Sequence, residues 1–121
     1  LHLSVHSFPT RRSSDLWDLR DKILGLIGDL PKIDEIRISE TMRITGASGW
    51  KTRGTWQHME RRIVIHRPVL KSPTEFAATL LHEAAHPKSG NAPDQTREFE
   101  RALTDMLGEC AMAAVDRSMG T

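Results

Sequence analysis

The stretch SPTEFAATLLHEAAHPKSG, Ser72 to Gly90, carries the clearest helix signal in the chain. A serine followed by a proline and then, three residues on, by a glutamate is a capping box with proline at the first helical position. Apolar residues then recur at helical spacing, which places one buried stripe along the segment. The members of this stripe are Phe76, Ala77, Leu80, Leu81 and Ala84. We therefore predict a helix from Pro73 to about His86.

Two histidines and a glutamate lie at the end of this helix, in the sequence His82-Glu83-Ala84-Ala85-His86. Histidines four residues apart project from the same side of a helix about one turn apart, which suits two nitrogen donors of a tetrahedral zinc ion. Glu83 points to an adjacent sector, where its carboxylate can reach a water on the metal without displacing it. The pattern predicts a zinc site with His82 and His86 as ligands and Glu83 as general base. A helix that only displays two surface histidines is the plainer alternative.

A catalytic zinc site of this kind needs a third protein ligand, and three acidic residues downstream compete for the role: Asp94, Glu98 and Glu100. The segment DQTREFERALTDMLGECAMAAV predicts the next helix, and its inward face is marked by Phe99, Leu103, Met106, Leu107 and Cys110. At 100° per residue, Glu100 lies about 60° from the centre of that face and Glu98 about 140° from it. Asp94 precedes the helix, where it also suits an N-cap or loop position, as does Thr96. Glu100 is the preferred third ligand, with Asp94 and Glu98 as alternatives.

Pro87 directly follows the second histidine. Proline disfavours the helical conformation of the residue before it and removes a backbone donor toward Glu83, so the helix could end early and displace His86. The opposite outcome is equally compatible with the sequence, because Ser89-Gly90 is a natural helix stop that lies close behind in any case.

The remaining segments predict an α+β fold. WDLRDKILGLIGDLPK has apolar residues on one helical face and a proline at its end, which indicates an N-terminal helix. That face comprises Leu16, Leu19, Ile23, Leu24, Ile27 and Leu30. IDEIRISETMRI alternates Ile36, Ile38, Met42 and Ile44 with polar residues, and a second strand region ends in Ile63, Val64 and Ile65. We expect an N-terminal helix, a small antiparallel sheet, the helix from Pro73, and a C-terminal helix.

Composition limits the class of protein. With 121 residues, 38% of them hydrophobic, and no apolar run long enough for a bilayer, the chain reads as one small domain without a membrane segment. Its single cysteine, Cys110, excludes an internal disulfide and fits a reducing, cytoplasmic compartment. Cys110 lies among apolar residues, as expected for a buried, unreactive thiol.

The first 16 residues are expected to be a non-native leader, with the domain spanning residues 17–121. They show neither helical nor strand periodicity. FPTRRSSDL, Phe8 to Leu16, also matches the in-frame translation of a common sequencing adapter. Without Arg11, Arg12 and Asp15, the balance changes from 17 basic and 16 acidic residues to 15 of each. Bulk charge therefore favours no nucleic-acid partner.

TLLHEAAH followed by REFERALTDMLG resembles the zincin-type metallopeptidases, in particular a minimal gluzincin with HExxH on one helix and a glutamate on the next. The wider pattern from EIRISETMR through RRIVIHRPVL to FERALTDMLG resembles bacterial domains at the C-terminus of Hsp90-like (GHKL) ATP-binding proteins. These resemblances imply a zincin-like fold, Zn²⁺ held by His82, His86 and Glu100, Glu83 as general base, and an ATPase domain elsewhere in the full-length protein. Pro87 departs from the family pattern, which more usually has a helix-compatible small residue there.

The expected function is zinc-dependent hydrolysis of a peptide or protein substrate, with the strand RRIVIHR lying beside the cleft and pairing with an extended peptide through its edge. Two other classes stay open. One is a non-catalytic zinc-binding module that regulates or binds a partner, attached to the ATPase domain. The other is a structural helical domain without metal.

Overall fold

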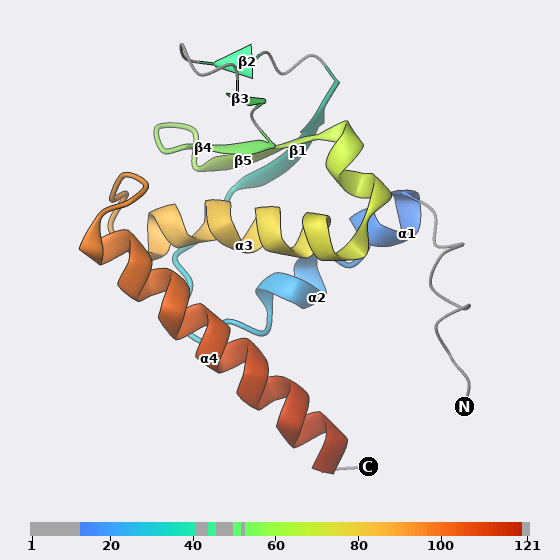
Figure 1. Cartoon of the computed structure of the whole chain (residues 1–121), viewed down its shortest axis with the longest axis vertical. Coiled ribbons are helices and arrows are strands. Elements are labelled where there is room, and N and C mark those ends of the chain that lie inside the picture. Colours follow the sequence, from blue (N-terminus) through green and yellow to red (C-terminus); the bar gives the residue numbers. More distant parts are fainter. Residues whose placement is uncertain (1–12, 41–43, 46–49, 52, 120–121) are drawn as a thin grey trace.

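The computed structural model describes residues 13–40, 44–45, 50–51 and 53–119. Its elements, in chain order, are α1 (Ser13–Trp17), α2 (Arg20–Leu24), β1 (Glu35–Ser39), β2 (Ile44–Thr45), β3 (Trp50–Lys51), β4 (Gly54–Gln57), β5 (Arg62–His66), the 3₁₀ helix η2 (Arg67–Lys71), α3 (Pro73–Lys88) and α4 (Arg97–Met119). The predicted α+β class is confirmed. Helix α3 lies between the sheet on one side and α4 on the other (Figure 1).

Helix α3 begins where the sequence predicts. Ser72 is the N-cap, and its side-chain oxygen accepts a hydrogen bond from the backbone N–H of Glu75 at 3.3 Å. Phe76, Leu80 and Ala84 are fully buried and face the centre of the core. The stripe also includes Thr79 and Glu83, two polar residues that are only 7% and 6% exposed. Thr79 and Glu83 therefore face β4, which packs against this side of the helix.

Pro87 does not shorten α3. The helix continues to Lys88, with Pro87 buried inside its last turn. The chain leaves the helix at Ser89 and Gly90, as predicted, and Gly90 takes a φ of 77°, which glycine adopts readily. Because the backbone stays helical through His86, both histidines keep their one-turn spacing on the same element.

The sheet is mixed, so the prediction of an antiparallel sheet is only partly right. Its strand order is β1-β5-β4, with β1 parallel and β4 antiparallel to β5. The register sets Ile36 beside Ile63 and Ile38 beside Ile65, and these residues pack in the core. Alternation along a strand reports which residues face the core and carries no information about strand direction, which explains the error.

The predicted strand over residues 33–44 is interrupted in the described part of the chain. Ile44 belongs to a separate two-stranded antiparallel ladder, β2 with β3, in which Ile44 pairs with Lys51. Met42, which the sequence also placed in that strand, lies outside the described residues.

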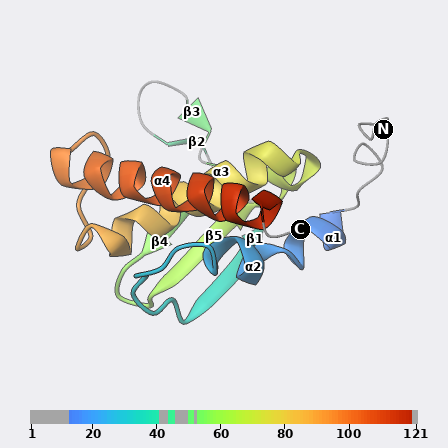
Figure 2. The same cartoon turned by 90° about the horizontal axis from the view of Figure 1, so that it is seen from below.

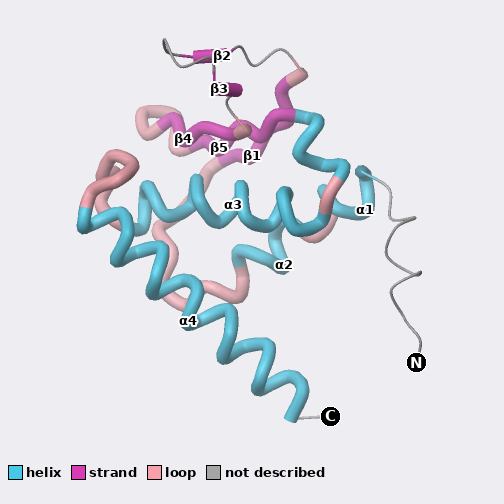
Figure 3. The backbone as a smooth tube through the Cα atoms, viewed as in Figure 1, coloured by secondary structure: helices cyan, strands magenta, loops and turns pink. Residues whose placement is uncertain are grey.

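The N-terminal helix predicted up to Leu30 is instead two short helices, α1 and α2, followed by a loop (Figure 3). The predicted apolar face still packs in the core: Leu16 and Ile27 are 2% and 5% exposed. Gly25 ends α2, and the backbone N–H of Gly28 donates to Glu109 Oε2 on α4 at 2.9 Å. Gly25 and Gly28, three residues apart, lower the helix propensity of this segment. The hydrogen bond to Glu109 gives the Gly28 N–H a partner in place of the one it would have in a helix.

Helix α4 lies across α3 (Figure 2). Its buried residues are Phe99, Ala102 and Met106, with Leu103 and Cys110 half-buried beside them. Leu107, predicted to face inward, is 60% exposed. Burial, with a smaller contribution from Glu109, raises the pKa of the Cys110 thiol. The residue is half-buried, whereas the sequence predicted a buried one.

Within the described residues, none of the helices combines the length and apolar character needed to cross a bilayer.

Candidate metal centre

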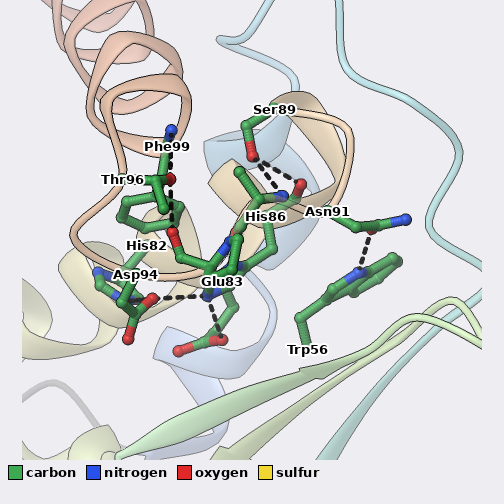
Figure 4. A network of polar contacts seen from close by, with 11 residues as sticks. Trp56, His82, Glu83, His86, Ser89, Asn91, Asp94, Thr96 and Phe99 are labelled. Carbon is green, nitrogen blue, oxygen red and sulfur yellow. Dashed lines mark hydrogen bonds and ion pairs between the residues drawn. The ribbon is translucent and has the colours of Figure 1, made fainter.

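Three side chains from two segments meet at the end of α3 (Figure 4). His82 and His86 come from α3, and Asp94 comes from the loop that connects α3 to α4. Asp94 Oδ1 lies 3.3 Å from Nε2 of His82 and 3.0 Å from Nε2 of His86. One donor atom from each of the three residues lies within 4.8 Å of the other two.

Two of the three spacings between these atoms fit a single small cation. Zinc–nitrogen and zinc–oxygen bonds of about 2.0–2.2 Å in a tetrahedron place neighbouring ligand atoms about 3.3–3.5 Å apart. The two histidine–aspartate distances, 3.3 and 3.0 Å, lie at or just below this range. Two imidazoles and one carboxylate are also the donor types that zinc takes when a fourth position stays open for a ligand.

The protonation of His86 adds an independent argument. Nδ1 of His86 lies 2.9 Å from the backbone carbonyl oxygen of Ala92, which can only accept, so Nδ1 carries the proton. Nε2 is then the ring atom that faces Asp94 Oδ1, at 3.0 Å, and it is an acceptor whenever the ring is neutral. Two acceptors at this distance repel unless a cation or a second proton lies between them. A carbonyl that orients a histidine in this way is the usual outer partner of a metal ligand.

The imidazoles are also held from behind by an aromatic ring. Phe99, at the start of α4 and 3% exposed, has its ring centroid 4.9 Å from that of His82 and 4.6 Å from that of His86. Packing of this kind restricts both rings to a narrow range of orientations. Phe99 therefore limits the rotation of the two histidine rings in the absence of a ligand.

The loop that carries Asp94 is tied to both neighbouring helices. The Ser89 hydroxyl donates to the carbonyl of His86 at 2.9 Å and accepts from the N–H of Ala92 at 3.2 Å. At the far end, the Thr96 side chain caps α4 by accepting from the N–H of Phe99 at 3.2 Å. The cap is thus Thr96, and Asp94 is left free to face the histidines.

A third tie links this loop to the sheet. The indole Nε1–H of Trp56, on β4, donates to Asn91 Oδ1 at 2.8 Å (Figure 4). Asn91 has a φ of 66°, a left-handed conformation that asparagine tolerates better than most residues. No local pattern pairs Trp56 with Asn91, because the two residues come from different elements and lie 35 residues apart in the chain.

Glu83 lies beside the three candidate ligands without belonging to them. Its Oε1 is 3.8 Å from His86 Nε2, and its side chain is 8% exposed. Burial, and secondarily the negative charge of Asp94, raises the pKa of Glu83 to about 8. A pKa close to neutral pH, next to a candidate metal centre, suits a group that both accepts and returns protons.

Gly54 is the point where the sheet approaches Glu83 most closely. A Cβ atom added there would lie 2.9 Å from Cγ2 of Thr79, 3.1 Å from the carbonyl oxygen of Val64 and 3.2 Å from Cγ of Glu83. These contacts are shorter than side chains normally make, so only glycine lets β4 lie against α3 at this position. Gly54 therefore sets the position of Glu83 from the opposite side.

We expect Gly54→Ala to destabilise the fold by about 1–3 kcal/mol and to reduce any activity of the site by about 10- to 100-fold, through displacement of Glu83. The matched control is Gly108→Ala on α4, where an added Cβ meets nothing within 4 Å. That change should stabilise the helix by about 0.5–1 kcal/mol and leave the site unaffected. Thermal unfolding and zinc titration of both variants check the prediction; equal effects at the two glycines would contradict it.

Two hollows open onto the site. The first, of about 420 Å³, is lined by Arg53, Gly54, Ala78, Thr79, His82, Glu83 and Asp94. The second, of about 500 Å³, is lined by Gly54, Thr55, Trp56, His58, Glu83, His86, Asn91, Ala92, Pro93 and Asp94. Gly54, Glu83 and Asp94 border both, so the candidate metal centre can be reached from two sides.

The structure does not bring Glu100, the preferred third ligand from sequence, to the histidines. Glu100 is exposed and lines a different hollow along α4, with Thr96, Arg97 and Arg101 among its neighbours. The reason is that Leu107, which the prediction placed on the inward face of α4, is exposed. The face that is buried has its centre farther from Glu100 than the predicted face has. Glu98 is exposed as well. Of the three acidic candidates, only Asp94 meets His82 and His86.

Comparisons of the chain with protein-family profiles, with curated proteins and with solved structures find no match.

Proposed function

We propose that the chain is a zinc-dependent hydrolase of peptide bonds in which His82, His86 and Asp94 hold the metal and Glu83 is the general base. The observation that carries the proposal is the convergence of three donor atoms: Asp94 Oδ1 lies 3.3 Å from Nε2 of His82 and 3.0 Å from Nε2 of His86, an arrangement that a shared cation stabilises. Asp94 replaces Glu100 in the ligand set because of its position. Zinc held by such donors supplies Lewis-acid chemistry toward a water and a carbonyl.

Glu83 has the position for proton transfer. It is nearly buried, it lies within 4 Å of a candidate ligand, and it borders both hollows through which a substrate would enter. In the proposed reaction its carboxylate takes a proton from the attacking water and passes it to the leaving amine. A buried carboxylate with few competing partners suits both steps.

The sheet offers an edge for an extended peptide, although not the one predicted. β5, which contains RRIVIHR, is the central strand, with β1 and β4 on either side of it. In the described sheet β4 is the edge strand nearest the site, and its residues line both hollows. Strand addition to β4 would lay a peptide along the candidate metal centre. From the sequence resemblance to domains of Hsp90-like ATP-binding proteins, we further propose that the full-length protein contains an ATPase domain.

Zinc content and hydrolysis together test the proposal. The purified chain, stripped of metal and then dialysed with zinc, is expected to retain about one zinc per chain by elemental analysis. It should cleave a library of internally quenched decapeptides, lose that activity in a chelator, and regain it when zinc is restored. One zinc per chain without cleavage of any peptide would support the non-catalytic zinc-binding module instead. A folded chain that retains no zinc would overturn both.

A further inference from the structure

Among the described residues, positive charge borders the cleft over the candidate metal centre on one side. Of these residues, Arg53 is the one arginine or lysine that lines the first hollow, and none lines the second hollow, past Trp56. The first hollow is also lined by two small residues, Gly54 and Ala78, which leave room beside the Arg53 guanidinium. A side chain that enters from this side therefore meets a cation at the mouth and the metal centre behind it.

The Arg53 backbone is anchored while its side chain is available. The carbonyl oxygen of Arg53 accepts a hydrogen bond from the N–H of His66 at 2.8 Å, which extends the pairing of β4 with β5 by one residue. Within the described part of the chain, its guanidinium forms a loose ion pair with Glu75 Oε1 at 3.7 Å, and the two side chains are 68% and 47% exposed. Exposed ion pairs of this length contribute little, so a carboxylate in the hollow can compete with Glu75.

We propose that the Arg53 hollow is a specificity pocket for an acidic side chain of the peptide, on one side of the bond that is cleaved. This inference rests on the proposed function and names its substrate class. Asp94 and Glu83 border the hollow as well, but both lie within 4 Å of His86 Nε2, where a bound metal would offset their charge. Arg53 thus provides the outer charge that selects aspartate or glutamate over lysine.

The test uses decapeptides that carry glutamate, glutamine or lysine at each position near the cleaved bond. With the zinc-loaded chain, we expect glutamate to exceed lysine in kcat/KM by about tenfold or more, at positions on one side of the bond only. Arg53→Glu should reverse this preference, and Arg53→Lys should keep it in weaker form. The matched control is Arg67→Glu, an exposed arginine on η2 that pairs with Glu40 at 3.1 Å and lines neither hollow. It should leave the preference unchanged.

Peptide binding gives a second readout that does not need turnover. Fluorescence anisotropy with the same peptides and the Glu83→Gln variant should show the same preference, and Arg53→Glu in that background should invert it. Cleavage without any acidic preference, or a preference that Arg53→Glu leaves intact, overturns the inference while the proposed function stands. Acidic preference in binding with no cleavage by the unmodified chain means that the peptidase proposal fails and the pocket is real.

Discussion

Replacing Asp94 with alanine is expected to lower the affinity of the chain for zinc by more than about 100-fold, whereas Glu100→Ala should leave it unchanged. Loss of an outer partner of a ligand already costs about 10- to 100-fold, and Asp94 has the position of a ligand itself. Its Oδ1 is the atom on which both histidine Nε2 atoms converge, at 3.3 and 3.0 Å. Glu100 faces a hollow on the other side of α4.

Competition titration against a chromophoric chelator measures both affinities. The Asp94 side chain is 59% exposed, so its removal should preserve the fold, which circular dichroism of the metal-free variant checks. Asp94→Asn is the conservative variant: it keeps the shape and loses the charge, and we expect an intermediate loss of affinity. If Glu100→Ala lost zinc and Asp94→Ala retained it, the ligand set proposed from the structure would be refuted and the one expected from sequence restored.

Glu83→Gln is expected to lower kcat by about 100- to 10,000-fold while the chain keeps its zinc. Glutamine has nearly the shape of glutamate but cannot accept a proton from water. Glu83 lies outside the group formed by His82, His86 and Asp94, so its replacement should change zinc affinity far less than Asp94→Ala does. Steady-state kinetics on one cleaved decapeptide and zinc analysis of the same sample provide the two measurements.

The pH dependence of folding stability, compared between the unmodified chain and Glu83→Gln, tests whether Glu83 is a buried carboxyl group that holds its proton in the folded chain. In the metal-free chain the pKa of Glu83 is raised from 4.5 to about 8, chiefly by burial. Between these values the unfolded chain has released the proton and the folded chain holds it, so Glu83 makes stability fall as the pH rises through this window. Denaturant unfolding at several pH values should show a smaller fall for Glu83→Gln. Unchanged kcat in a zinc-loaded, folded variant would remove Glu83 from the mechanism.

Local sequence determined α3 and two of the three candidate ligands. The cap at Ser72, the proline after it and the apolar spacing all act within a few residues of one another, so they specify the helix without help from the rest of the chain. The spacing of His82 and His86 follows from helix geometry alone. The end of the helix at Ser89 and Gly90 was predictable as well, because it also depends on neighbouring residues. Pro87 is accommodated in the last turn.

The third candidate ligand, Asp94, was determined by tertiary structure. The rotation of α4 depends on how Phe99, Ala102 and Met106 pack, and periodicity could not distinguish them from the exposed Leu107. Asp94 lies in a loop, which has no repeating geometry from which a direction could be inferred. Its position results from hydrogen bonds of the loop to α3 and, through Asn91 and Trp56, to β4.

The sheet and the N-terminal segment show the same division. The sequence alone identified Ile36 and Ile38 as the residues of their strand that pack against the core, because alternation reports which side chains share a face. Strand direction and the break between α1 and α2 depend on contacts between residues far apart, such as Ile36 with Ile63 and Gly28 with Glu109. The sequence by itself thus determined the helix that carries the histidines and Glu83. Only the tertiary structure brought Asp94, Gly54 and Arg53 to that helix, because side chains from separate elements meet only where those elements pack.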